Sequence, residues 1–139
     1  MRRLLACVLL VSACSLGPRV KTFAPAHDPQ GALAKVTRGR ASFRAELLAV
    51  ADSALLVINT DAARVVLAPY NAFTTVAFPD FPATFTVRGN HPPTARLREH
   101  LRLWSRFPSG VDAVLLQRLL SAYGQDSLVV LAPCAGRRC

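Results

Sequence analysis

Acidic residues are scarce in this chain, with 8 Asp and Glu against 17 Lys and Arg, and the formal net charge is +9. Glycine-rich phosphate loops, dinucleotide fingerprints and the C-x-x-C and H-E-x-x-H metal motifs are all missing. A length of 139 residues holds one modest domain, which excludes two coupled catalytic domains and a multi-helix transporter. Apolar residues, in contrast, make up 52% of the chain, and this share argues against a wholly disordered protein.

The few titratable groups do not favour an enzyme. Most aspartates stand at predicted turns or caps, so a carboxylate pair for acid and base work would have to come from turn residues. His27, His91 and His100 have no cysteine or carboxylate neighbours at metal-ligand spacing, so neither a metal site nor a cofactor is predicted. The alternative is a small envelope hydrolase in which His91 or His100 works with a turn aspartate, Asp80 or Asp126.

The N-terminus has the pattern of an export signal. Arg2 and Arg3 precede an apolar run over residues 4–11, and Ser12 and Ala13 lead to Cys14. About ten apolar residues form roughly 15 Å of helix, half of a hydrocarbon core of about 30 Å. A signal peptide over residues 1–13 is therefore predicted rather than a transmembrane helix.

The run Val11–Cys14 resembles the lipobox of bacterial lipoproteins, with an aliphatic residue, two small residues and a thiol. The resemblance implies cleavage before Cys14, a diacylglyceryl group on its sulfur and an acylated amino terminus, usually palmitoylated. It places the protein in the cell envelope, anchored to the lipid bilayer through Cys14. Ser15, where an inner-membrane lipoprotein usually has Asp, favours the outer membrane if the cell has two. The alternative is an ordinary secretory signal cut at Ala13 or Ala6.

Composition then divides the rest of the chain. Residues 14–40 contain spaced prolines and glycines without a hydrophobic period, and they are predicted to be the lipidated N-terminus and a flexible tether. Residues 41–132 are predicted to form one α+β domain, and residues 133–139 a loose tail. Cys134 and Cys139 in that tail can form a small disulfide in an oxidising compartment, and the alternative is two free thiols.

The first half of the domain is predicted to be a small, bent antiparallel sheet of about four strands. The first strand alternates apolar and polar residues, which is typical of one buried and one wet face, whereas the next two are apolar throughout and should be covered on both faces. The pattern of strands and turns loosely resembles SH3-like and Sm-like barrels as a partial barrel. The expected strands are Phe43–Val50, Leu55–Ile58, Val65–Ala68 and Phe73–Phe78, with further short runs at Thr84–Val87 and Leu128–Leu131.

The second half has a helical period. Helices are predicted from about Thr94 to Arg106 and from an N-cap at Asp112 to Tyr123, packed as a two-helix hairpin on the open side of the sheet. Arg98, Arg102 and Arg106 follow one another at i+4 spacing and are predicted to form a stripe that contacts anionic headgroups, the alternative being a plain solvated face. The stripe lacks interleaved aromatic residues, so no nucleic acid partner is predicted.

Together these observations predict an envelope lipoprotein that acts as a binding or structural accessory, with an unidentified envelope protein as partner and no defined reaction. The exposed parts expected to serve are the helical hairpin, the turn at Phe107–Gly110 and the corner at Tyr70. A second alternative is an exported protein whose barrel binds a small ligand.

Overall fold

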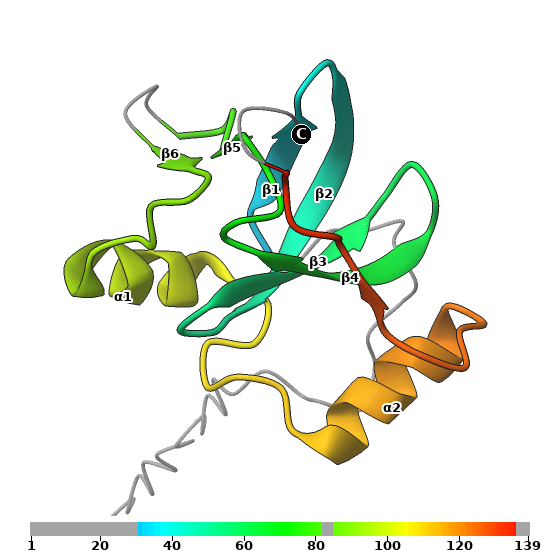
Figure 1. The fold of residues 1–139 in the computed structure, drawn as a ribbon. Helices are drawn as coiled ribbons and strands as arrows, with labels where there is room; N and C mark the ends of the chain where they lie inside the picture. Colours follow the sequence, from blue (N-terminus) through cyan, green and yellow to red (C-terminus); the bar gives the residue numbers. More distant parts are fainter. Residues whose placement is uncertain (1–30, 82–84, 136–139) are drawn as a thin grey trace, which may run out of the picture.

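A computed structural model describes residues 31–81 and 85–135 of the chain, so the predicted signal peptide, Cys14 and Cys139 lie outside the described residues. The domain combines two helices with one mixed sheet, and the predicted α+β class is confirmed (Figure 1). Its elements are β1 Leu33–Arg38, β2 Ala41–Val50, β3 Ala54–Asn59, β4 Arg64–Pro69, β5 Thr75–Ala77, β6 Thr86–Arg88, α1 Ala95–Trp104, α2 Ala113–Ala122 and β7 Val129–Val130.

The sheet has the strand order β6-β5-β1-β2-β3-β4-β7. Strands β1 to β4 form an antiparallel meander, β5 returns to pair with the far side of β1, and β7 runs parallel to β4. Over residues 31–81 and 85–135 there are thus seven strands, so the expected number of about four was too small. The sheet is open, with β6 and β7 at its two edges.

Strand β1 lies within the segment that was predicted to be a tether. Ala34 and Val36 are buried in the core, and all six residues of β1 pair with β2. Gly39 has φ +59 in the two-residue turn between these strands, a conformation that glycine adopts without strain. The prediction of a tether to residue 40 was therefore wrong, because the folded domain already includes Leu33–Arg38.

The start of the predicted loose tail is also bound to the domain. The Leu131 amide donates to the Leu67 carbonyl at 3.0 Å, and the Cys134 amide donates to the Asn71 carbonyl at 2.8 Å. The Arg38 guanidinium donates to the Ala132 carbonyl at 2.9 Å. Residues 133–135 therefore belong to the domain, and only residues 136–139 of the expected tail lie outside the described residues.

Two hydrophobic cores lie on opposite faces of the sheet. Leu55 and Val57 of β3 contribute to the larger core, whereas Leu56 and Ile58 contribute to the smaller one, as the two-residue period of a strand requires. The larger core contains Val87 of the edge strand β6 and Val66 of β4, which lies near the opposite edge. A sheet that brings both residues into one core is strongly curled. The expectation that the second and third apolar runs are covered on both faces is confirmed.

The two helices cover different faces and do not form a hairpin. Leu101 of α1 packs in the larger core, whereas Leu119 and Leu120 of α2 pack in the smaller one. No contact joins α1 to α2 in the described part of the chain, and Figure 1 shows them well apart. The predicted hairpin was wrong because the connection between the helices is hydrogen-bonded to β2, which directs α2 to the other face.

This connection binds to an irregularity in β2. The register of β2 with β3 shifts between Leu47 and Ala49, as in a β-bulge. The Leu47 carbonyl accepts from the Arg106 amide at 3.0 Å, and the Leu48 carbonyl accepts from the Phe107 amide at 2.8 Å. The chain after α1 is therefore bound to β2 by these two hydrogen bonds, and the helix ends at Trp104 instead of the predicted Arg106.

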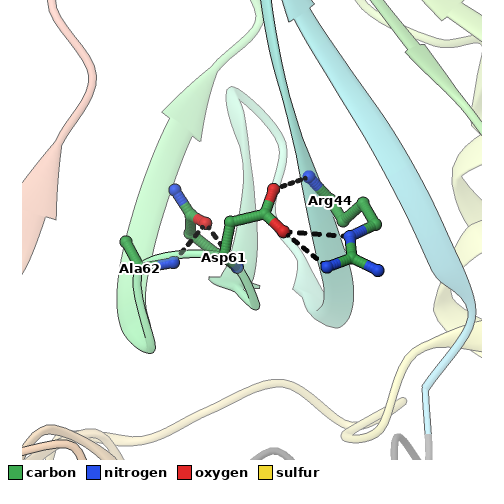
Figure 2. A network of polar contacts seen from close by, with 4 residues as sticks. Arg44, Asp61 and Ala62 are labelled. Carbon is green, nitrogen blue, oxygen red and sulfur yellow. Dashed lines mark hydrogen bonds and ion pairs between the residues drawn. The ribbon is translucent and has the colours of Figure 1, made fainter.

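A polar network fixes the turn between β3 and β4 (Figure 2). The Asn59 side-chain oxygen accepts from the amides of Asp61 and Ala62, each at 3.0 Å. The Asp61 carboxylate accepts from the Arg44 amide at 2.8 Å and from the Arg44 Nε at 2.9 Å. These hydrogen bonds from Arg44 lower the pKa of Asp61. The network joins the turn to β2 beyond the last residue that pairs with β3.

Candidate functional site

Two of the three predicted stripe arginines lie together on α1. Arg98 Nη1 is 2.9 Å from Asp52 Oδ1, in the turn between β2 and β3. Arg102 Nη2 is 3.7 Å from the same oxygen, and Arg102 Nη1 is 3.6 Å from Glu99 Oε2. The Asp52 side chain is 84% exposed, so these ion pairs are each worth only about 0–1 kcal/mol. Asp52 and Glu99 nevertheless neutralise part of the positive charge of Arg98 and Arg102.

Arg106 does not belong to this surface, and its predicted contact with headgroups was wrong. It lies after the end of α1, and its side chain is 3% exposed. Its guanidinium makes two hydrogen bonds to Glu46, Nε to Oε1 at 2.7 Å and Nη2 to Oε2 at 2.8 Å. The helical period does not extend to Arg106 because its backbone is bound to β2.

Glu46 is the partner of Arg106, a role that was not predicted from the sequence. The alternation of β2 places it on the polar face, yet its side chain is fully buried. Its Oε1 also accepts from the Gly31 amide at 2.9 Å. The only local signal is a carboxylate directly before the apolar residues Leu47–Val50; its cationic partner is 60 residues away.

A cavity lies beside the Tyr70 corner, which was predicted as an exposed functional part. It has a volume of about 390 Å³ and adjoins the Asp52 ion pairs. The ring of Tyr70 is buried, and its hydroxyl donates to the Ala51 carbonyl at 3.1 Å. The polar groups available to a ligand are amides, a hydroxyl and one carboxylate. The cavity is lined by Asp52, Ser53, Pro69, Tyr70, Asn71, Asn90 and Pro92.

Burial raises the pKa of Tyr70 from 10.0 to about 12, against a smaller lowering by the Arg98 charge. The unfolded chain releases this phenol proton near pH 10, whereas the folded chain retains it until about pH 12. The contribution of Tyr70 to stability is thus complete below pH 10 and is lost as the pH rises through 12. We expect the urea midpoint of the wild type to fall over this window and that of Tyr70→Phe to fall less. Tyr123→Phe is the control, which should keep the wild-type loss because it retains Tyr70; equal alkaline loss in all three proteins would contradict the assignment.

The residues of the alternative hydrolase are not brought together. Within residues 31–81 and 85–135, no hydrogen bond or ion pair joins His91 or His100 to Asp80 or Asp126. His100 instead stacks on Trp104, with ring centroids 6.4 Å apart. That indole packs face to face on Phe81 at 4.0 Å and edge-on to Phe85 at 4.6 Å. The histidine thus belongs to an aromatic cluster.

The cysteines are divided between described and undescribed parts of the chain. Cys134 is disulfide-bonded and its amide binds the Asn71 carbonyl, whereas Cys139, its predicted partner, lies outside the described residues. Cys14, the predicted lipidation site, also lies outside them.

The described ranges contain no group of three or more His, Cys, Asp and Glu side chains that could hold a metal ion. Neither described helix has the length and apolarity needed to cross a membrane. Comparison of the chain with family models, with curated proteins and with solved structures found no match.

Proposed function

We propose that the protein is an envelope lipoprotein, anchored to a lipid bilayer through acyl chains on Cys14, whose small domain acts as a binding or structural accessory. The observation that carries the proposal is the run Val11–Cys14, which follows two arginines and a short apolar segment. One acyl chain holds a protein only marginally, whereas two or more hold it firmly. Ser15 favours the outer membrane as the destination in a cell with two membranes.

The domain supports an accessory role over catalysis. Its conspicuous polar groups pair with one another, as Arg98 does with Asp52 and Arg106 with Glu46. The meander of β1 to β4, with β5 beside β1, supports the likeness to SH3-like and Sm-like barrels. Such a likeness carries no activity by itself. The proposed partner is an envelope protein that binds an exposed part of the domain, such as the cavity beside the buried Tyr70, where Asp52 and Asn71 are exposed.

The anchor is tested by replacing its thiol. We expect intact-mass measurement of detergent-extracted wild type to show a chain that begins at Cys14 and carries the added mass of its acyl groups. Cys14→Ala should lose the added acyl mass, because acyl attachment needs the sulfur. Cys7→Ala is the matched control, since it removes a thiol from the apolar segment of the signal and should leave the anchor unchanged. An unmodified thiol at Cys14 in membrane-extracted protein would overturn the proposal.

A further inference from the structure

In the described part of the chain, one half of the sheet has a face that no helix covers. On β1, β5 and β6, the residues Val36, Val76 and Val87 point into the larger core. Their neighbours along each strand therefore point to the opposite side. On that side α2 packs over β2, β3 and β4, through Leu48, Leu56 and Val65 among others, and no other element of residues 31–81 and 85–135 covers β1, β5 and β6.

Strand register brings cations and hydroxyls together on this surface, here called the open sheet face. One row across the four strands consists of Arg88, Thr75, Thr37 and Ser42. The next row places Lys35 between Ala77 and Arg44. Lys35, Arg88, Ser42 and Arg44 are exposed, and the two threonines are half-buried. None of these seven residues is acidic, so the face combines three positive charges with three hydroxyl groups.

This composition matches a phosphate-rich surface. Cations near an anionic bilayer each contribute about 1 kcal/mol of attraction. Hydroxyl groups between the cations can donate hydrogen bonds to phosphate oxygens. The rows contain no aromatic ring on which a nucleobase could stack, so the face suits headgroups better than a single-stranded nucleic acid.

The charge on the open sheet face is less neutralised than that on α1. Arg98 and Arg102 share Asp52, and Arg102 also lies near Glu99. On the open sheet face Arg44 is paired, with Asp61, but its side chain remains 81% exposed. The salt bridges found among the described residues include neither Lys35 nor Arg88.

The chain also enters the domain beside this face. Glu46 follows Ser42 and Arg44 on the same side of β2, and its carboxylate accepts from the amide of Gly31, the first described residue. Residues 15–30 connect this point to Cys14. We propose that the open sheet face lies against the anionic headgroups of the bilayer to which Cys14 anchors the protein, an inference that rests on the proposed lipoprotein function.

The test uses the full chain with Cys14→Ala, so that acyl chains do not contribute to binding. Its co-sedimentation is measured with phosphatidylcholine vesicles and with vesicles that also contain phosphatidylglycerol, at low salt. Adding Lys35→Gln and Arg88→Gln should lower partitioning into the anionic vesicles roughly tenfold or more, because each cation is worth about fivefold. Partitioning into phosphatidylcholine, which the apolar N-terminus can support, should not change. Raising the salt should remove the difference between the two vesicle types.

The matched control removes the same number of charges elsewhere. Arg96→Gln with Arg118→Gln takes one exposed cation from each helix and should lower anionic partitioning less than threefold. Asp61→Asn removes the carboxylate that pairs with Arg44 and should increase partitioning into the anionic vesicles but not into phosphatidylcholine, whereas misfolding that exposes apolar residues would increase both. Equal losses in the two double variants, or no gain from Asp61→Asn, would overturn the inference. So would loss of heparin binding by the sheet-face variant without loss of vesicle binding, since the partner would then be a soluble polyanion. Cys14 is replaced throughout, so failure here is distinct from an unmodified Cys14 thiol in the native protein.

Discussion

Replacing Arg106 by methionine is expected to lower the free energy of unfolding by about 3–5 kcal/mol. The substitution leaves the Glu46 carboxylate without its bidentate partner in a position where its side chain is fully buried. The Gly31 amide at 2.9 Å is a single neutral donor and cannot replace a guanidinium. The loss would be measured by urea denaturation at neutral pH.

Replacing Glu46 as well as Arg106 distinguishes the net contribution of the ion pair from the cost of leaving one charge buried without its partner. Glu46→Leu alone should also be strongly destabilising, because it removes the carboxylate that pairs with the Arg106 guanidinium, whose side chain is 3% exposed. The double variant should recover most of the loss, since a buried ion pair is often replaced by apolar residues at little net cost. Arg44→Met is the control, because it breaks an Arg–Asp pair of the same chemistry whose arginine is 81% exposed, and it should change stability by about 1 kcal/mol or less. If Arg106→Met lost no more than this control, the pair would not have the structural role assigned to it.

The second large effect is expected at Gly89. A Cβ atom there would lie 1.6 Å from the Phe73 carbonyl oxygen and 2.7 Å from its carbon, so the backbone itself would have to move. The Gly89 amide also donates to the Thr74 carbonyl at 2.8 Å, which holds the end of β6 against the start of β5. Gly89→Ala should therefore destabilise the domain by about 3 kcal/mol or more, as strong overpacking does.

Gly124 provides the comparison for this substitution. It follows α2 with φ +62, and a Cβ at this position would meet nothing within 4 Å. Gly124→Ala should therefore cost only about 1 kcal/mol, from the left-handed backbone alone. Thermal denaturation of both variants compares the steric cost at Gly89 with the backbone cost at Gly124. Similar losses of stability in the two variants would contradict a steric origin at Gly89.

Local sequence patterns predicted those parts of the fold that depend on neighbouring residues. The Asp112 side chain accepts from the Leu115 amide at 2.7 Å as an N-cap, and α2 ends before Gly124 as predicted. The apolar runs of β3 and β4 are buried on both faces as expected. These features follow from capping and from the two-residue period, which a single sequence contains.

The features that were missed depend on distant contacts. Strand β1 has six residues beside glycines and prolines, and its burial is determined by pairing with β2 and β5. The end of α1 and the place of α2 are set by the amides of Arg106 and Phe107 on the β2 carbonyls. For the same reason the i+4 spacing predicted that Arg106 lies on a surface stripe, whereas it pairs with Glu46 in the interior. The open sheet face was missed with β1, since it exists only once the strands are aligned.

The two-sided burial of β3 has a consequence for how the strand finds its alignment. Leu55 and Val57 face one core, whereas Leu56 and Ile58 face the other. A slip by one residue would exchange these pairs, and hydrophobicity alone would hardly oppose it because all four are aliphatic and similar in size. The polar clamp at the end of the strand does oppose it, since a slipped strand would separate the Asn59 turn and Asp61 from Arg44 (Figure 2). A few solvent-facing polar groups at the end of the strand therefore select the correct register, whereas the apolar cores would stabilise the sheet in either register.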